Sequence, residues 1–244
     1  MTKVGYIRRT NQEETYVHKS EQKRNFNKSF YNMKALIVVD VQNDFLPGGS
    51  LAVPHGDEIV KPVIELIEDP TRKWDQVVMT RDWHSYDHIS FAKMHNLPDF
   101  SPINYKSPLE GDDRTQEGIL FPVHCVEETH GSQLVPELLE VQKKMGCFVV
   151  NKGYLQDREC FSAFNDIWNF HKTELHDYLH CHDVDEVFVV GLALDYCVKN
   201  TAISAAKLGY KTTILQKYTR GFISDEKSMQ DFKQELAENN VQLA

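Results

Sequence analysis

Short apolar runs alternate with amphipathic segments from Met33 to the end of the chain, and this alternation restricts the fold more than any other feature. The runs are rich in Val, Ile and Phe, whereas the segments between them repeat apolar residues at helical spacing. Such alternation is typical of a parallel sheet with helices on both faces. We therefore predict an α/β fold with a mostly parallel sheet of about five to six strands. The strands are expected at 34–39, 76–80, 147–151, 186–190 and 211–215, and the helices at 59–67, 132–145, 161–179, 197–208 and 225–238.

The segment between the second and third predicted strands contains many residues that interrupt regular structure. Prolines and glycines stand at 98, 102, 108, 111, 118 and 122, so we predict a long loop over residues 85–131. A structureless connection of this length within a compact domain is usually functional. Its residues are therefore candidates for a binding site.

Charge and composition exclude several classes of protein. The 244 residues carry a formal net charge of -9, and the body of the chain has no basic stripe interleaved with aromatics, so we expect no nucleic-acid binding. No stretch of about eighteen apolar residues occurs, so we expect no membrane span. The five cysteines include no C-x-x-C pair and no signal peptide is recognisable. We expect an intracellular protein of the cytoplasm, with the nucleus or the peroxisome as alternatives.

Residues 1–32 differ in composition from the rest of the chain. They hold seven Lys and Arg residues against three Glu residues, and their apolar residues follow neither a strand nor a helix period. We predict a flexible basic N-terminal extension at 1–32, followed by one domain at 33–244. A weak organelle-targeting sequence is the alternative, and the three glutamates count against it.

Polar residues capable of chemistry stand just beyond the ends of the predicted strands. Asp40 follows the first strand, Asp82 and His84 the second, Lys152 the third, and Cys197 begins the helix after the fourth. In open parallel sheets, ligands bind in the crevice at the carboxyl ends of the strands. A single polar residue at a strand end would indicate little, but a thiol, a carboxylate and an ammonium at one edge indicate a catalytic site.

These three groups suit nucleophilic catalysis. The first turn of a helix favours an anion and lowers the pKa of a thiol, so Cys197 is the candidate nucleophile. Asp40 can take the thiol's proton and later return it to a leaving amine, while Lys152 holds the geometry. The alternative for Cys197 is a buried structural cysteine.

A second group of residues has the composition of a metal site. In an extended segment, Asp82 and His84 point to the same face and can bind one divalent metal ion. His124, at the end of the long loop, is the candidate third ligand, and His88 is a further candidate. Three protein ligands with open positions are typical of a catalytic site.

Five segments together resemble the motifs of a known family. They are Val38-Val39-Asp40-Val41-Gln42-Asn43-Asp44-Phe45, Thr80-Arg81-Asp82-Trp83-His84, Pro122-Val123-His124-Cys125, Asn151-Lys152-Gly153 and Gly191-Leu192-Ala193-Leu194-Asp195-Tyr196-Cys197-Val198. From about Met33 to the C-terminus, the chain resembles the nicotinamidases of the isochorismatase-like cysteine hydrolase superfamily, especially those of fungi. The resemblance does not extend to residues 1–32.

The resemblance implies a fold, an activity and a cofactor. The fold is the isochorismatase-like three-layer sandwich, and the cofactor is zinc. The activity is deamidation of nicotinamide to nicotinic acid and ammonia through a thioester, a step of pyridine nucleotide salvage for NAD biosynthesis. The expected partner is this small substrate, with a homo-oligomer as an option that the sequence leaves open.

The resemblance also assigns roles to individual residues. It implies a catalytic triad of Asp40, Lys152 and Cys197, and zinc ligands Asp82, His84 and His124. It implies an oxyanion hole formed by the N–H groups of Ala193 and Cys197, next to a cis peptide bond that precedes Ala193. The implied substrate contacts are Phe45, Phe121, Phe161 and Tyr196. Phe121 and Phe161 depart from the fungal pattern of Trp and Tyr, which retains ring stacking but removes two polar edges and leaves substrate preference open.

Other interpretations compete with this one. A non-catalytic binding module on the same fold is the alternative from another class, and the intact triad argues against it. Isochorismate hydrolases lack the cysteine, and carbamoyl amidases lack this metal motif. His176 and His180 imitate an H-x-x-x-H metal pair, but their polar surroundings predict a solvated helix face. Cys125 has no convincing base nearby in the sequence, so we predict a packing role for it.

Overall fold

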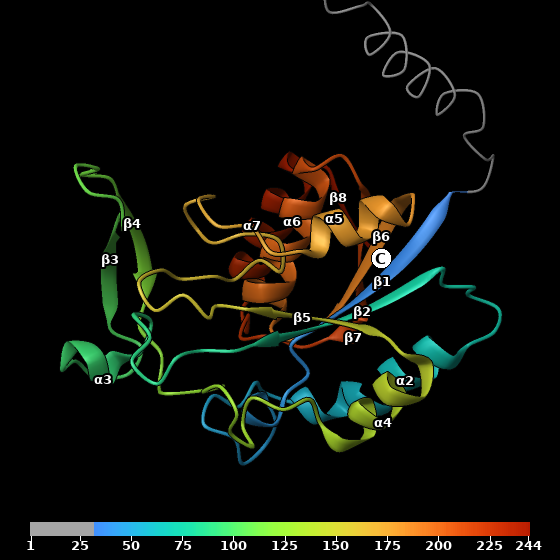
Figure 1. Cartoon of the computed structure of the whole chain (residues 1–244), viewed down its shortest axis with the longest axis horizontal. Helices are drawn as coiled ribbons and strands as arrows, with labels where there is room; N and C mark the ends of the chain where they lie inside the picture. The colour runs from blue at the N-terminus through green and yellow to red at the C-terminus, as the bar shows by residue number, and fades with distance from the viewer. Residues whose placement is uncertain (1–31) are drawn as a thin grey trace, which may run out of the picture. The chain divides into compact units, whose positions relative to one another are not determined.

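A six-stranded parallel sheet runs through residues 32–244, the part of the chain that the computed structural model describes (Figure 1). Its strand order is β5-β2-β1-β6-β7-β8, and every neighbouring pair is parallel. The predicted α/β class is confirmed, and β8 is an additional edge strand that the apolar runs did not predict. The strands are β1 (Met33–Val39), β2 (Gln76–Asp82), β5 (Phe148–Lys152), β6 (Val184–Gly191), β7 (Lys211–Thr219) and β8 (Val241–Leu243).

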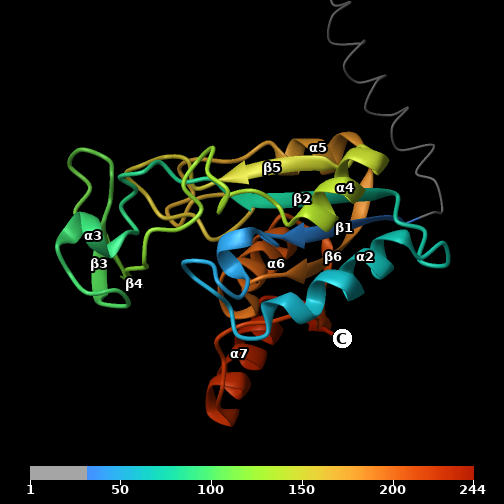
Figure 2. The same cartoon turned by 90° about the horizontal axis from the view of Figure 1, so that it is seen from below.

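Helices cover both faces of the sheet (Figures 1 and 2). On β1, Leu36 and Val38 point into one core cluster, whereas Ile37 and Val39 point into the other. From Ala35 to Val39 β1 is buried on both faces, and this part of its sequence is apolar without interruption. One face carries α2 (Val60–Glu68) and α4 (Pro136–Met145), and the other carries α5 (Leu175–Cys181), α6 (Lys199–Lys207) and α7 (Glu226–Glu238), with short 3-10 turns at η1 (Asn43–Phe45) and η2 (Gly56–Ile59).

The prediction of a structureless loop over 85–131 was wrong. The segment contains α3 (Ala92–His95) and an antiparallel hairpin of β3 (Pro102–Lys106) and β4 (Thr115–Ile119), which project as an arm in Figure 1. Pro102 begins a strand, a position where proline is tolerated. At Gly118 a β-carbon would lie 2.5 Å from a ring carbon of Tyr105, so glycine makes room for that ring. Residues that usually break strands therefore build this hairpin.

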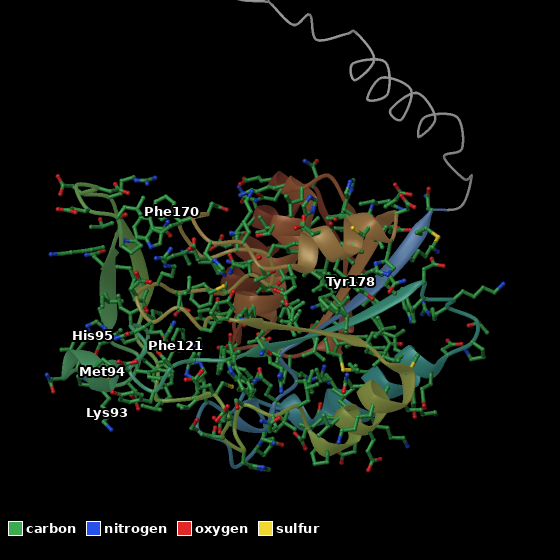
Figure 3. The ribbon with its side chains drawn as sticks, in the orientation of Figure 1. Lys93, Met94, His95, Phe121, Phe170 and Tyr178 are labelled. Atoms are coloured by element: carbon green, nitrogen blue, oxygen red, sulfur yellow. The ribbon has the colours of Figure 1, made fainter. Side chains whose placement is uncertain are left out.

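The predicted helix at 161–179 is present only in its last part, as α5. The residues before α5 form turns around the buried carboxylate of Asp166. This carboxylate accepts the N–H groups of Trp168, Phe170 and His171 at 2.8, 3.1 and 3.0 Å. A side chain that binds backbone N–H groups competes with a helix for them. Trp168 and Phe170 pack against the arm instead, and Phe170 is labelled beside it in Figure 3.

The predicted extension at 1–32 lies outside the described residues except for Asn32, and it stays a prediction. Met33–Ala244 form one compact unit. Within residues 32–244, no helix combines the length and the apolar character that crossing a bilayer requires.

Candidate active site

The carboxyl ends of four neighbouring strands bring the predicted catalytic residues together. The chain passes from β1 to β2 and β5 on one side, and then to β6, β7 and β8 on the other, so the strand order reverses beside β1. A crevice opens at such a switch point. Asp40 follows β1, Asp82 and Lys152 end β2 and β5, and Cys197 lies in the turn after β6.

Lys152 lies at the centre of this cluster and is completely buried. Burial alone would lower its pKa, but Asp40 and Asp82 raise the pKa well above the usual value. The side chain is therefore a fixed cation rather than a proton donor. Its Nζ lies 3.0 Å from Asp40 Oδ2, contacts Asp82 Oδ1, and donates to Cys197 Sγ and to the Cys160 carbonyl, each at 3.3 Å.

Asp40 turns the chain out of β1 and faces the thiol. Its φ of 50° lies in the left-handed region, which aspartate adopts more readily than most residues. Thr80 Oγ1 donates to Asp40 Oδ1 at 2.6 Å, whereas Oδ2 faces the Lys152 ammonium at 3.0 Å. Burial raises the pKa of Asp40 to about 6, and the Lys152 charge opposes that rise. Oδ2 is therefore placed to take up a proton.

Cys197 lies in η3 (Leu194–Val198), a π turn that leads directly into α6. Its sulfur and a carboxylate oxygen from each of Asp40 and Asp82 lie within 4.8 Å of one another. Burial raises the pKa of the thiol well above its usual value, although the Lys152 charge acts in the opposite direction. The expected lowering of the thiol pKa by the helix end was therefore wrong, because desolvation outweighs it. A thiol whose pKa is raised needs a nearby base to form the thiolate.

The peptide bond between Leu192 and Ala193 is cis, as the resemblance implied. The Ala193 N–H donates to no acceptor within the described residues, and Ala193 and Cys197 line the same cavity. The Leu194 N–H donates to the Arg220 carbonyl at 2.8 Å, which holds the turn from outside the cavity. A backbone donor without a partner beside a nucleophile suits an oxyanion hole.

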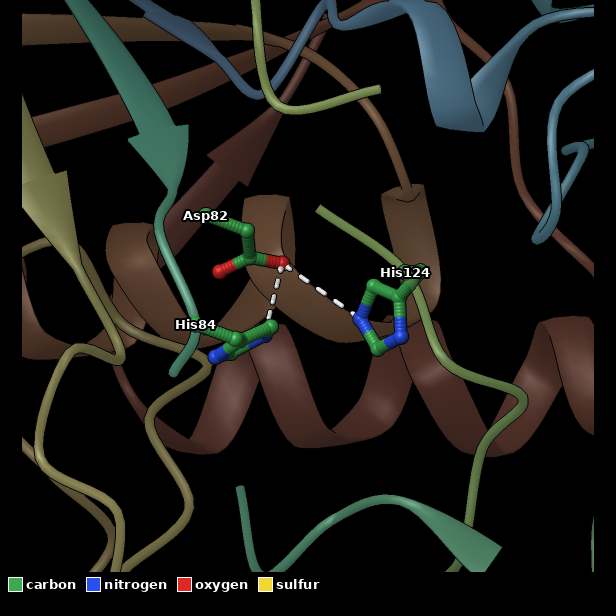
Figure 4. A group of neighbouring side chains, drawn as sticks. All are labelled: Asp82, His84 and His124. Atoms are coloured by element: carbon green, nitrogen blue, oxygen red, sulfur yellow. Dashed lines mark ion pairs between the residues drawn. The ribbon is translucent and has the colours of Figure 1, made fainter. Parts of the chain in front are cut away.

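The three predicted metal ligands converge from β2 and from the segment that follows the arm (Figure 4). Asp82 Oδ2 lies 3.8 Å from His84 Nε2 and 4.0 Å from His124 Nε2. All three side chains are buried. Separations of about 3 to 4 Å between ligand atoms are those found around a single tetrahedral ion.

The second ring nitrogen of each histidine is already engaged. His84 Nδ1 lies 2.7 Å from the Gly153 carbonyl, and His124 Nδ1 lies 2.8 Å from the Pro122 carbonyl. A carbonyl only accepts, so each Nδ1 carries the proton and each Nε2 presents a lone pair. Burial lowers the pKa of both rings, which keeps them neutral. Gly153 is required here, because a β-carbon would lie 2.5 Å from His84 Cε1.

The charge of the buried cluster also suits a bound cation. Asp40 and Asp82 contribute two negative charges when both are ionised, and Lys152 contributes one positive charge, which leaves a net charge of one negative. An uncompensated buried charge is costly. A divalent cation would offset it, and one carboxylate with two imidazoles is a donor set that zinc accepts.

His88 lies behind the candidate metal ligands rather than among them. Its ring packs on His84 in a tilted arrangement, with the ring centroids 4.1 Å apart and the planes at 31°. Its Nδ1 lies 2.8 Å from Ser90 Oγ, and its Nε2 lies 3.1 Å from the Arg158 carbonyl. Both nitrogens have partners, so His88 supports the His84 ring by packing.

A cavity of about 390 Å³ opens over the thiol and the metal-facing atoms. Phe121, labelled between α3 and the sheet in Figure 3, forms part of its wall. The Phe121 ring packs edge to face on Tyr196 and Phe161, with centroids 5.7 and 6.3 Å apart. Together with Phe45, these rings form walls that suit a flat aromatic ligand, and all four predicted substrate contacts line the cavity.

Three other lining residues were not predicted from the sequence: Leu51, Glu159 and Phe222. Glu159 is buried, and burial raises the pKa of its carboxyl to about 7. It stands in the charged run Asp157-Arg158-Glu159, a composition that usually indicates a solvated surface. The sequence therefore held no signal of its position.

Two groups that imitate functional residues take no part in lining the cavity. Cys125 is completely buried, and its backbone N–H donates to Asp44 Oδ2 at 2.7 Å, in agreement with the predicted packing role. His176 Nδ1 lies 2.9 Å from the Tyr210 hydroxyl, and His180 is exposed on α5. The H-x-x-x-H pair is therefore separate from the candidate metal ligands.

Comparison with known proteins shows similarity over most of the chain. The Isochorismatase domain family matches residues 34–238. The nicotinamidase of Saccharomyces cerevisiae is 54% identical over 211 residues, which are 86% of this chain and 98% of that protein. The crystal structure of the yeast nicotinamidase bound to the inhibitor nicotinaldehyde matches with a TM-score of 0.85 at 53% identity, covering 87% of this chain and 99% of that one. A pyrazinamidase of Pyrococcus horikoshii in complex with zinc matches with a TM-score of 0.65 at 30% identity, covering 86% and 98%.

Proposed function

The chain belongs to the Isochorismatase domain family, and on this premise we propose that it hydrolyses nicotinamide to nicotinic acid and ammonia. The nicotinamidase relative, which the chain covers almost completely, supports this substrate. The enzyme is then an amidohydrolase that cleaves the C–N bond of a linear carboxamide. Its product enters pyridine nucleotide salvage, a route to NAD.

One observation carries the proposal. The ammonium of Lys152 contacts both a thiol and a carboxylate beside an aromatic cavity. The same cavity is lined by one carboxylate and two imidazoles that could bind a metal ion. Covalent amide hydrolysis needs a nucleophile, a group that moves its proton, and a site for the carbonyl oxygen. A binding module would need none of them in contact.

The acylation half of the reaction follows from these contacts. Cys197 Sγ gives its proton to Asp40 Oδ2 and attacks the carboxamide carbon, while the Lys152 ammonium stabilises the thiolate. The carbonyl oxygen of the tetrahedral intermediate accepts from the N–H groups of Ala193 and Cys197. Asp40 returns the proton to the amide nitrogen, the C–N bond breaks, and ammonia leaves a thioester.

Water completes the cycle through the same groups, with Asp40 again acting first as base and then as acid. Asp40 takes a proton from water, and the hydroxide attacks the thioester carbon. The Cys197 sulfur leaves as a thiolate and regains the proton from Asp40. The sum is nicotinamide and water converted to nicotinic acid and ammonia.

Zinc is the metal that the donor set favours. We infer that Asp82, His84 and His124 hold it, because two neutral imidazoles and a carboxylate suit zinc and leave coordination positions open. The zinc complex of the related pyrazinamidase supports the choice of metal. When bound there, zinc supplies an open position that can take a pyridine nitrogen.

The test of the function is ammonia release from nicotinamide by the purified protein, with metal analysis of the same sample. We expect stoichiometric nicotinic acid and ammonia, and about one zinc ion per chain. Failure to release ammonia from nicotinamide in a folded, zinc-loaded sample would refute the proposal.

Replacing Asp40 with asparagine is expected to lower the rate of acyl-enzyme formation at least about a hundredfold, because an amide cannot take the thiol's proton. Rapid-quench measurement of the thioester checks this step directly. Asparagine keeps an oxygen that can accept from Thr80, so the local structure should survive. A normal rate of thioester formation in this variant would remove Asp40 from the mechanism.

A further inference from the structure

Gln42 is a completely buried polar residue that the mechanism above does not use. Its side-chain amide faces the backbone of Asp82: Oε1 accepts the Asp82 N–H at 2.8 Å, and Nε2 donates to the Asp82 carbonyl at 2.8 Å. Nε2 also donates to the Ser132 carbonyl at 2.8 Å. The amide therefore uses its oxygen and both of its N–H groups in a place where unpaired polar atoms are costly.

This contact continues the pairing of β1 with β2 past the point where β1 stops. The parallel register ends at Val38 with Met79, and the chain turns away at Asp40, where φ is 50°. A primary amide offers the same donor and acceptor as a peptide group. The Gln42 side chain therefore takes the place of the strand backbone beside Asp82.

A reciprocal contact runs from β2 to the end of β1. Thr80 Oγ1 donates to Asp40 Oδ1 at 2.6 Å and accepts the Asp40 N–H at 3.2 Å. Each strand end thus supplies a side chain that fixes the acidic residue of the other. Thr80 holds Asp40, and Gln42 holds Asp82.

We propose that Gln42 is a positioning residue that fixes the backbone of Asp82 and so directs its carboxylate toward Lys152 and the two candidate histidine ligands. Asp82 Oδ1 contacts Lys152, while Oδ2 faces His84 and His124, so one carboxylate serves both groups. A rotation of the Asp82 backbone would disturb both contacts together. The inference rests on the proposed zinc site.

The test is the zinc affinity of Gln42→Met, which keeps a similar length and volume but has no amide. The zinc Kd, measured without substrate by competition with a chromophoric chelator, is expected to rise about tenfold or more, the usual effect of losing a partner that orients a metal ligand. This readout does not depend on turnover, so it separates metal binding from catalysis.

Two comparison variants separate positioning from a general loss of stability. Thr80→Val removes the reciprocal contact to Asp40, so it should lower kcat while the zinc Kd stays within about twofold of wild type. Tyr178→Phe removes the 2.6 Å hydrogen bond from its hydroxyl to Gln76 at the opposite end of β2, and should change neither quantity.

A zinc Kd for Gln42→Met within about twofold of wild type would overturn the positioning role of Gln42 and leave the proposed zinc site standing. A wild-type protein without zinc affinity would overturn the proposed zinc site together with it. If Gln42→Met does not fold, the test is the hydrogen exchange of the Gln42 side-chain amide in the wild type, measured by NMR. Both protons of this amide are hydrogen-bonded and buried. They should exchange with solvent at least about a hundredfold more slowly than those of an exposed glutamine, and exchange at the exposed rate would contradict the proposal.

Discussion

Replacing Cys197 with alanine is expected to reduce nicotinamide turnover below about 1% of wild type, because in the proposed mechanism the sulfur forms the bond to the substrate carbon. The side chain lies in a cavity wall beside Lys152, so its removal should leave the fold and the zinc content intact. Ammonia release at saturating nicotinamide measures the loss. The melting temperature and metal analysis of the same sample verify that the protein is otherwise unchanged.

Cys147→Ala is the matched control for this variant. Cys147 and Cys197 are equally buried, with 7% of each residue exposed. Cys147 precedes β5 at its amino end and does not line the cavity, so its removal should leave turnover unchanged. Turnover above about 1% in Cys197→Ala would contradict the nucleophile assignment, whatever the control shows.

The grouping of the candidate catalytic residues could be predicted because each of them stands at or shortly after the end of an apolar run. Asp40 directly follows β1, Lys152 ends β5, and Cys197 lies in the turn after β6. Any order of parallel strands places their carboxyl ends at one edge, so the grouping did not require knowledge of the strand order. The order itself, with β1 between β2 and β6, could not be inferred from the runs.

The features that escaped prediction depend on contacts between distant segments. The arm forms because Tyr105 packs over Gly118 and joins Trp168 in a small core of its own, which no local pattern shows. From the sequence, Gln42 has the character of a polar loop residue. Its partner, Asp82, lies forty positions later and is brought beside it only by the fold. In both cases a residue type that is unfavourable locally becomes favourable through a partner far away in the sequence.

The pKa of the Cys197 thiol also depends on contacts that neighbouring residues in the sequence do not reveal. The helix that follows Cys197 was expected to lower its pKa, and that argument used only neighbouring residues. Burial of the thiol acts in the opposite direction and is stronger, so the pKa of Cys197 rises. A base beside the thiol is then needed, and Asp40, whose pKa burial raises to about 6, is the candidate for that role.

Benzamide tests whether the ring nitrogen of nicotinamide is recognised. It has the same carboxamide and nearly the same shape, but it has no nitrogen to bind an open position at the site formed by Asp82, His84 and His124. The aromatic walls alone would then orient the ring, and a displacement of the reacting carbon by about 1 Å can cost on the order of a hundredfold in rate. We expect kcat/KM for benzamide to be at least about a hundredfold lower than for nicotinamide, measured by ammonia release from the zinc-loaded enzyme.

His84→Ala should reduce the difference in kcat/KM between nicotinamide and benzamide by lowering only the value for nicotinamide. The variant loses a candidate ligand, so the advantage of nicotinamide should fall, whereas benzamide, which gains nothing from the ring-nitrogen contact, should be hydrolysed at nearly its former rate. His180→Ala removes an exposed imidazole on α5 and should leave both substrates unaffected. Similar kcat/KM values for the two amides in the wild type, or an equal loss for both in His84→Ala, would mean that the ring nitrogen is not what anchors the substrate. The aromatic walls, with Phe121 and Phe161 at their centre, would then be the main source of orientation.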